Sequence, residues 1–365
     1  MSSAHNHPEV ESTGAHTQFY DKFNIRYEIF QVIKCIWSND IYQKHLTQES
    51  KYVRYDSSSW PYLTSHRTNI EFFLIFVNLL LNDATYVLDE ALTKFPKINS
   101  LEAELAPGAS VLTPEQRTAK EEELSTAQSQ AQSYMQLTNE TVAMMKLFTK
   151  TLSTSFTMPE IVDRVAAMLD YTLNTLVGPK SMNLKVADPT KYQFNPKFLL
   201  GEFIDIYLNL GVSESFVEAV ARDGRSYKPE TFNAASRILN RFNLKSPEEL
   251  ALWEKLKNRF QIAKELDDQA EEDLGEIPDE YADPIMATLM TDPVILPMSR
   301  QTVDRSTIRS HLLSDPHDPF NRSPLKIEDV VEDTELKAKI VAWMAEKKAE
   351  ARAVREGDKM DITEW

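Results

Sequence analysis

Residues 115–158 contain neither proline nor glycine, and this stretch limits what the chain can fold into more than any other feature. Thr113, Pro114 and Gln116 stand in the order of a hydroxyl N-cap, a first helical residue and a capping-box partner. The pattern predicts one helix from Pro114 to about Leu152, about 57 Å long. Its first half is polar, and apolar residues at helical spacing make its second half the part that we expect to be buried.

Proline and glycine also mark other helix boundaries. Helices are predicted to begin near Pro159, at Asn195-Pro196 and at Ser246-Pro247. At the last two, a cap residue precedes a proline at the first helical position. Gly178-Pro179 is expected to end the first of these helices with a left-handed cap followed by a breaker. An apolar helix over residues 70–95 is expected to end at Pro96, because proline lacks the N–H that continues a helix.

The fold class that follows is mostly α. Serial antiparallel helices over residues 19–275 predict an elongated, armadillo-like helical stack, and residues 1–18 are expected to form a disordered lead-in. The acidic run over 267–273 is interpreted as the solvated end of a helix followed by a linker through Gly275; the alternative is a binding patch for a basic partner.

The sequence changes character after residue 277 and predicts a small ββα module over 277–350. Two short strands, near residues 293–296 and 302–304, form a hairpin. Asp304 then caps a short helix, and a last amphipathic helix begins near Thr334. Residues 351–365 are expected to form a C-terminal tail.

Composition excludes several classes of function. The net charge of −16 argues against nucleic acid and against an anionic membrane surface as partners. The most apolar stretch, residues 70–81, is too short for a membrane span, which needs about 20 residues. Cys35 is the single cysteine, which excludes an internal disulfide and favours a reducing compartment. We therefore expect a soluble, intracellular protein without membrane attachment.

The C-terminal module resembles the U-box, on elements that occur in order and at the right spacings. They are Ile277-Pro278-Asp279-Glu280, Asp283-Pro284-Ile285, Leu289-Met290-Thr291-Asp292-Pro293-Val294, Asp304-Arg305-Ser306, His311-Leu312 and Asp318-Pro319-Phe320-Asn321-Arg322-Ser323-Pro324-Leu325.

Upstream segments resemble the core of the U-box chain-elongation ligases of the ubiquitin-fusion-degradation type. They are residues 133–141, 158–164, 176–180 and 221–227. Members of this family are longer, so the resemblance implies a C-terminal fragment or an abbreviated form.

The module contains too few metal ligands for a zinc-bound RING. Residues 277–365 include no cysteine and only two histidines, His311 and His317. No metal or other cofactor is expected, and the loops must be held by apolar packing and a polar network. The expected members are Leu289, Met290, Asp292, Asp304, Arg305, Ser306, His311, Asp318, Asn321 and Ser323. His311 is expected to bond loop backbone; a role as a base has no accompanying nucleophile.

The resemblance implies a ubiquitin ligase that recruits a ubiquitin-charged conjugating enzyme and promotes non-covalent transfer to substrate or ubiquitin lysines, extending chains for proteasomal degradation. It places Arg322 as the residue that bridges the conjugating enzyme and its ubiquitin. The docking positions that it implies are Ile285, Ala287, Pro319, Phe320 and Pro324.

Other interpretations of these residues remain open. Without the resemblance, loop packing would be favoured for Ile285 and Pro319, and an internal ion pair to Asp318 or Asp304 for Arg322. U-boxes usually carry an aromatic residue at the position of Ala287, so docking there is weakened or compensated by a neighbour such as Phe320. Cys35 lies in an apolar helix, where we expect it to pack in the core and not to form a thioester.

The resemblance also implies partners and a location. These are ubiquitinated substrates, a valosin-containing-type AAA ATPase and proteasome-shuttling factors, in the cytoplasm and nucleus. The rival hypothesis is a non-catalytic adaptor, in which the U-box binds partners without productive docking of a conjugating enzyme.

Overall fold

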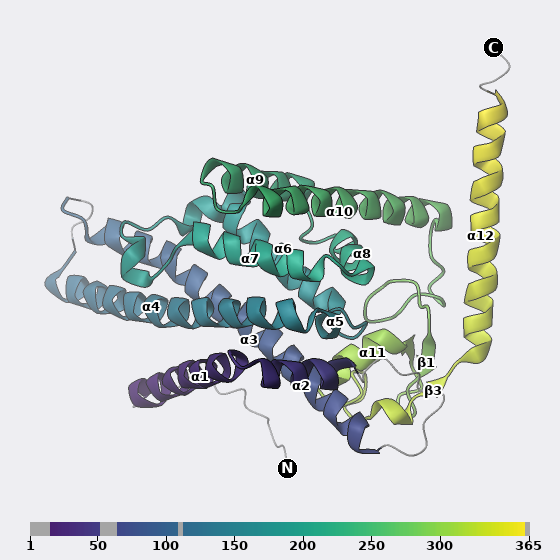
Figure 1. Cartoon of the computed structure of the whole chain (residues 1–365), viewed down its shortest axis with the longest axis horizontal. Helices are drawn as coiled ribbons and strands as arrows, with labels where there is room; N and C mark the ends of the chain where they lie inside the picture. The colour runs from purple at the N-terminus through teal and green to yellow at the C-terminus, as the bar shows by residue number, and fades with distance from the viewer. Residues whose placement is uncertain (1–14, 52–63, 109–111, 362–365) are drawn as a thin grey trace.

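A stack of helices carries a small mixed domain at one end (Figure 1). The computed structural model describes residues 15–51, 64–108 and 112–361. The expectation of a mostly helical chain with a small C-terminal sheet is confirmed. The helices of the stack are α1 Ala15–Trp37, α2 Asp40–Lys51, α3 Thr64–Leu105, α4 Pro114–Thr151, α5 Ser153–Phe156, α6 Val162–Val177, α7 Pro196–Leu210, α8 Glu214–Arg222, α9 Pro229–Arg241 and α10 Pro247–Leu274.

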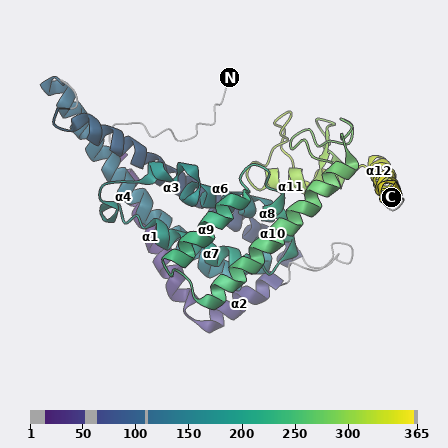
Figure 2. The ribbon, with the colours of Figure 1, turned by 90° about the horizontal axis from the view of Figure 1, so that it is seen from above.

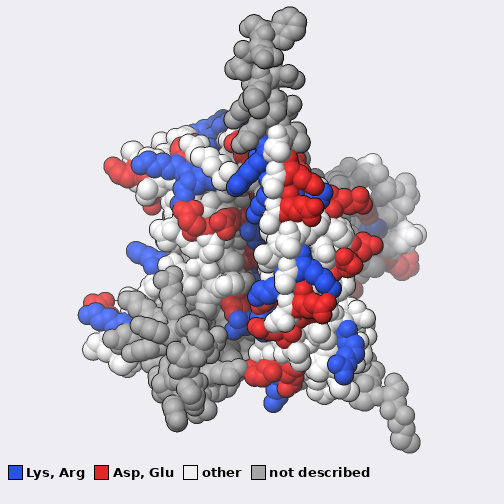
Figure 3. Space-filling model, turned by 90° about the vertical axis from the view of Figure 1, so that its right-hand side faces the viewer, with Lys and Arg blue, Asp and Glu red and all other residues white. Residues whose placement is uncertain are grey.

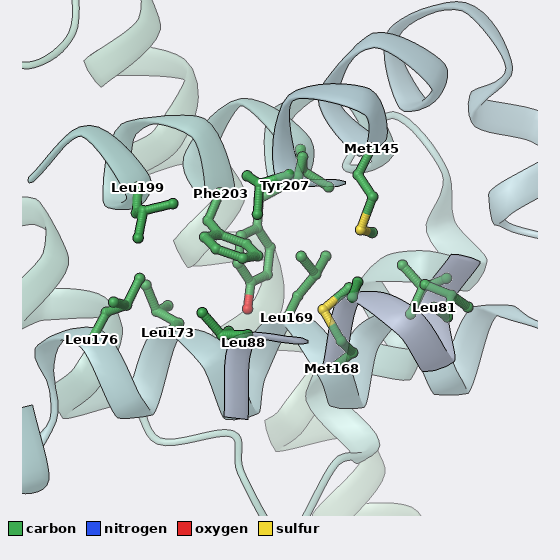
Figure 4. Close-up of a cluster of buried hydrophobic side chains, with 14 of the residues drawn as sticks. Leu81, Leu88, Met145, Met168, Leu169, Leu173, Leu176, Leu199, Phe203 and Tyr207 are labelled. Atoms are coloured by element: carbon green, nitrogen blue, oxygen red, sulfur yellow. The ribbon is translucent and has the colours of Figure 1, made fainter. Parts of the chain in front are cut away.

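Successive helices pack in layers. The two longest helices, α3 and α4, lie against each other; α1 contacts α4 on one side, and α6 and α7 follow on the other. Helices α8, α9 and α10 form the far layer, and α10 crosses it diagonally (Figure 2). Side chains from α3, α4, α6 and α7 interdigitate in the centre (Figure 4), where Leu88, Met145, Leu169 and Phe203 are buried. One continuous core therefore joins the layers.

The capping signals gave the correct helix starts. Thr113 and Gln116 form the predicted capping box of α4, and Ser246 and Glu249 form that of α10. Helix α4 ends at Thr151, one residue from the predicted end. Such caps act within one turn of the chain, so they do not depend on the rest of the fold.

Proline did not end α3 as predicted. The helix continues through Pro96 to Leu105, and the prediction of a stop was wrong. Pro96 is exposed, whereas Phe95, Ile98 and Leu101 around it are buried. Proline inside a helix costs about 3 kcal/mol through the lost hydrogen bond and the clash of its ring, and burial of each large apolar side chain contributes about 1.5–3 kcal/mol. Packing against α4 therefore outweighs the proline.

Gly178 ends α6, but not through a left-handed cap. Its φ of −77° and ψ of −175° are extended, which contradicts the prediction. Glycine is needed here for space, because a Cβ would lie 2.3 Å from the carbonyl oxygen of Asn174.

Cys35 is exposed, so the prediction that it packs in the core was wrong. The side of α1 that faces the core carries Phe30, Ile33 and the buried Trp37, and Cys35 lies off that stripe. The expected lead-in over residues 1–18 is described only from Ala15, where α1 begins; the rest lies outside the described residues.

The C-terminal domain contains the predicted hairpin and one unpredicted strand. Strands β1 Pro293–Ile295 and β2 Thr302–Asp304 pair antiparallel, and β3 Val331–Glu332 pairs with the other edge of β1, which gives the order β2-β1-β3. Helix α11, Arg305–Leu312, follows β2 directly, and Ile308 fills a small core between sheet and helix.

The last helix, α12 Thr334–Asp361, extends well past the small sheet (Figure 1). Most of residues 351–365, which we expected to form a C-terminal tail, belong to this helix. Figure 3 looks onto it and shows charges of both signs interspersed along the part of the helix that is not grey. Arg355 of α12 pairs with Asp273 near the end of α10, so the acidic helix end contacts another element.

The C-terminal domain is attached to the stack by polar contacts at α11. Arg309 forms an ion pair with Glu160 at 2.8 Å, and the Glu160 side chain is 9% exposed. Asn78 of α3, 1% exposed, donates to the carbonyl oxygen of Leu313 at 3.3 Å and to Oγ of Ser314 at 3.2 Å. Both contacts lie on one short helix and the turn that follows it, so they fix how the domain sits on the stack.

Candidate functional site

Three loops of the C-terminal domain share one backbone geometry. They are residues 283–288, 296–301 and 318–323, and each has proline at its second position. In each loop the N–H of the fifth residue donates to the carbonyl of the first, at 2.8, 3.0 and 2.8 Å. In each, the N–H of the first residue also donates to the carbonyl of the sixth, at 2.8, 2.9 and 2.8 Å. These closed loops need no metal to hold their shape.

The fifth residue of each loop is left-handed. Ala287, Arg300 and Arg322 have φ values of 56°, 59° and 63°. None is glycine, although a side chain in this region costs about 1–2 kcal/mol. The conformation is maintained because both ends of each loop are hydrogen-bonded across it.

Two fully buried carboxylates stabilise the first and third loops. Oδ1 of Asp283 accepts the N–H groups of Ile285 at 2.8 Å and Met286 at 3.0 Å. Oδ1 of Asp318 accepts the N–H of Phe320 at 2.9 Å. Both aspartates are 0% exposed. Each therefore fixes the turn just before the tip of its own loop.

Asp304 links the segment before β1 to α11. Its Oδ2 accepts the N–H groups of Thr291 at 2.6 Å and Asp292 at 2.9 Å, and its Oδ1 caps α11 by accepting from Ser306. Burial opposes the charged form of Asp304, but hydrogen bonds from the Ser306 hydroxyl and from backbone N–H groups outweigh it, so the pKa of Asp304 lies below its ordinary value. The carboxylate is thus a charged structural centre.

Arg305 joins the sheet to this centre. Its guanidinium contacts Asp292 at 2.6 Å and Glu332 of β3 at 2.9 Å. Burial raises the pKa of Asp292, but hydrogen bonds from Lys337 and Arg305 lower it by more. The pKa of Asp292 therefore lies below its ordinary value. The predicted polar network is therefore present around this residue.

The third loop is held at the opposite end of α11. A ring nitrogen of His311, Nε2, lies 2.9 Å from the carbonyl oxygen of His317, so this histidine bonds loop backbone as expected. Asn321 accepts both the N–H and the hydroxyl of Ser323, at 2.9 and 2.7 Å. Since α11 has eight residues, the contacts at its start and the contact to the third loop at its end lie about 12 Å apart.

The expected docking residues occupy the outside of these loops. Ile285 and Phe320 are each 42% exposed, Ala287 and Pro324 are exposed, and Pro319 is half-buried. Met290, expected to support them from within, is 2% exposed, and Leu289 is half-buried. The two loops thus present apolar tips on rigid, internally bonded bases.

Arg322 extends from the third loop into solvent. Its side chain is 73% exposed, and one guanidinium nitrogen lies 2.8 Å from Oδ2 of Asp315. The alternative of an internal ion pair is therefore present, but its partner is Asp315 and not Asp318 or Asp304. Arg322 is consequently available at the surface of the loop.

Several site residues were not singled out from the sequence. Asp283 is as central as Asp304, since its Oδ2 accepts the N–H of Asp304 at 2.7 Å. Met286, 61% exposed at the tip of the first loop, and Asp315 were also missed. The repeated proline at the second loop position was a visible signal, because the loops at 283, 296 and 318 share it.

Neither a metal cluster nor a membrane helix is present in the described parts of the chain. No three histidine, cysteine, aspartate or glutamate side chains within residues 15–51, 64–108 and 112–361 are grouped to hold a metal ion. In the same ranges no helix combines the length and the apolarity that a bilayer span requires.

Two family models match the chain in adjacent segments. The model described as Ubiquitin elongating factor core matches residues 7–261, and the U-box domain model matches residues 277–349. The second match covers the sheet, α11 and the three loops.

Full-length relatives align over nearly all of the chain. Ubiquitin conjugation factor E4 of Schizosaccharomyces pombe is 47% identical over 341 residues, which is 93% of this chain and 32% of that protein. E4 ubiquitin-protein ligase UFD2 of Saccharomyces cerevisiae is 40% identical over 94% of this chain and 34% of its own. Ubiquitin conjugation factor E4 A of Bos taurus is 39% identical over 94% and 32%. The chain spans about a third of the length of these relatives. With the core model matching well over half of it, this chain belongs to the ubiquitin elongating factor family and contains a U-box domain.

Proposed function

We propose that this chain is a ubiquitin ligase that extends ubiquitin chains by recruiting a ubiquitin-charged conjugating enzyme. The observation that carries the proposal is the pair of exposed apolar tips, Ile285 and Phe320, on loops that buried carboxylates hold without metal. Preformed apolar anchors on a rigid base are typical of protein interfaces, because little entropy is lost on docking. The names of the relatives support this choice of partner.

The transfer proceeds directly from the conjugating enzyme. A lysine amine attacks the thioester carbonyl, an amide bond forms, the C–S bond breaks, the thiolate of the conjugating enzyme leaves, and the proton lost by the amine nitrogen passes to water. Arg322 contributes by holding the enzyme and its ubiquitin in one arrangement, since a planar guanidinium offers five donors to carbonyls of both. Orientation of the thioester accelerates the attack. Cys35 takes no part, because it lies on α1, outside the U-box.

In this proposal Ala287 contributes little to binding of the conjugating enzyme. Its methyl group is exposed on a left-handed residue, and it offers little apolar area. The neighbouring Met286, 61% exposed, supplies flexible apolar surface at the same loop tip. Together with Phe320 it takes over the contact that an aromatic residue makes in other U-boxes.

The test is discharge of a ubiquitin-charged conjugating enzyme onto free lysine, with each enzyme of a panel. Ile285→Ala and Phe320→Ala should each weaken binding of the conjugating enzyme by about tenfold, as the loss of an interface anchor does. Arg322→Ala should slow discharge with binding preserved. Val341→Ala, which truncates a similarly exposed apolar residue on α12, is the control and should do neither. Absence of discharge and of chain formation with every enzyme would leave the adaptor hypothesis.

The wider partners and location follow from the same family and are part of the proposal. Ubiquitinated substrates, a valosin-containing-type AAA ATPase and proteasome-shuttling factors would bind the helical region, in the cytoplasm and nucleus, for proteasomal degradation. Co-precipitation of the chain with and without the U-box, residues 277–349, tests which part carries each partner.

A further inference from the structure

The side chain of Arg322 is exposed, and one of its guanidinium nitrogens is held by an ion pair. Its left-handed backbone, with φ 63°, directs the side chain away from the loop, and the N–H of Arg322 is bonded to the carbonyl of Asp318. One guanidinium nitrogen contacts Oδ2 of Asp315 at 2.8 Å. Since a guanidinium has five donors, this contact fixes the direction of the side chain and leaves most donors for another molecule.

Asp315 is itself anchored on three sides. Its backbone N–H donates to the carbonyl of His311 at 3.0 Å, at the end of α11. Its Oδ1 lies 2.5 Å from Nδ1 of His317. The hydrogen bond from His317, with the charges of Arg322 and His311, holds the pKa of Asp315 below its ordinary value. At neutral pH this carboxylate is therefore charged, and it is placed by backbone as well as by side-chain contacts.

A buried amide of the helical stack also bonds this segment. Nδ2 of Asn78, in α3, bonds the carbonyl of Leu313 and Oγ of Ser314, the two residues before Asp315. A buried polar side chain on the apolar side of a helix is costly unless it is bonded. The amide nitrogen of Asn78 finds these partners only in the U-box, so the turn that carries Asp315 is part of the interface between stack and U-box.

We propose that Asp315 is a positioning residue for Arg322, and that Asn78 extends this support to the helical stack. The inference rests on the proposed function, because it concerns the arginine that bridges the conjugating enzyme and ubiquitin. A side chain already directed outward loses less freedom when it binds both partners, which favours the closed thioester arrangement. The stack thus takes part in activating the thioester, in addition to placing substrates.

The central test is single-turnover discharge with Asp315→Asn at saturating conjugating enzyme. The expected result is a rate about three- to tenfold lower, which corresponds to one side chain left unordered, with affinity for the conjugating enzyme within about twofold of wild type. Asp315→Glu keeps the charge and should restore most of the rate. Glu335→Gln breaks an exposed ion pair to Lys339 on α12 and should leave the rate unchanged.

A double-mutant cycle separates positioning from general structural support. In the Arg322→Ala background, Asp315→Asn should have no further effect, because the group that it positions is gone. A loss of affinity in place of rate, or an equal slowing in both backgrounds, would overturn the inference. If Arg322→Ala is slow and Asp315→Asn discharges at the wild-type rate, the proposed function stands and only this inference fails. If Arg322→Ala itself discharges normally, both the bridging role and the inference are lost.

Asn78→Leu tests the link to the stack. It replaces the amide by an apolar side chain of similar size, so the stack retains its packing while Leu313 and Ser314 lose their donor. The expected result is the same pattern, a lower discharge rate at unchanged affinity, with Ser314→Ala as a milder second variant. Wild-type rates for both variants would restrict the positioning role to Asp315.

Discussion

The buried carboxylate of Asp283 accepts the backbone N–H of Asp304 at 2.7 Å, and this one bond ties the first loop of the U-box to the start of α11. Asp304 in turn bonds Thr291 and Asp292. The two aspartates thus form a brace, because their carboxylates bond the loop, the strand and the helix to one another. In a domain of this size such a brace often requires a metal ion.

Asp283→Ala should destabilise the U-box strongly. It leaves the N–H groups of Ile285, Met286 and Asp304 without an acceptor, and the expected loss is about 2–4 kcal/mol of unfolding free energy. Urea denaturation followed by the NMR signal of the Trp343 indole, whose ring lies 5.6 Å from that of Tyr281, measures it. Asp279→Ala, at an exposed position of the same segment, should change stability by less than about 0.5 kcal/mol. Equal stability of the two variants would contradict the brace.

Acid should unfold the U-box through Asp304 and Asp292. Both have a pKa below the ordinary value of 3.8 in the folded state. Their stabilising contribution is therefore present above that ordinary value and is lost as the pH falls through the lower pKa of the folded state. A titration of the Trp343 indole NMR signal from pH 6 to pH 2 should show unfolding of the domain below about pH 4. A urea midpoint that stays constant over this range would contradict the prediction.

The helical core should respond to pH in the opposite direction, through Asp170. Burial raises the pKa of Asp170 well above its ordinary value, the nearby charge of Asp223 adds to the rise, and the Tyr207 hydroxyl, 2.5 Å away, opposes it. Its contribution to stability is thus present below pH 3.8 and is lost as the pH rises through the raised pKa. Asp170→Asn should raise the melting temperature at pH 7 and not at pH 4.

Tyr207→Phe is the companion variant for this core pair. It removes the hydroxyl donor of the fully buried Tyr207 and leaves Oδ1 of Asp170 without a partner, which costs about 1–3 kcal/mol. Calorimetry at pH 7 should therefore show a lower melting temperature for Tyr207→Phe and a higher one for Asp170→Asn. If the melting temperature changed in the same direction in both variants, the buried carboxyl of Asp170 would not be what destabilises the core at pH 7.

Ala287→Gly should stabilise the U-box. With φ at 56°, the methyl group of Ala287 is strained by about 1–2 kcal/mol, and the added freedom of glycine in the unfolded chain offsets part of the gain. We expect a net gain of about 0.5–1 kcal/mol in urea denaturation. Ala345→Gly, at an exposed helical position of α12, should instead cost about 1 kcal/mol. A loss in both variants would contradict left-handed strain at Ala287.

Local rules explain what was predicted correctly. Thr113, Ser246 and Asp304 each cap a helix through atoms within a few residues, so their sequence context was sufficient. The same holds for the hairpin between β1 and β2, which closes over a short loop. The predicted polar network around Asp304 and Arg305 was recognised from its residue types and motif order, although its exact partners were not.

The sequence by itself determined where the capped helices α4, α7, α10 and α11 begin and that the U-box has no cysteine ligands for its loops, because capping and ligand counting are local properties. Only the tertiary structure decided that α3 continues through Pro96, that Cys35 lies at the surface, and that Arg322 pairs with Asp315. Each of these outcomes depends on which surfaces meet. The energy of burying or pairing a side chain is set by neighbours that lie far away in the chain, as Asn78 is from Ser314.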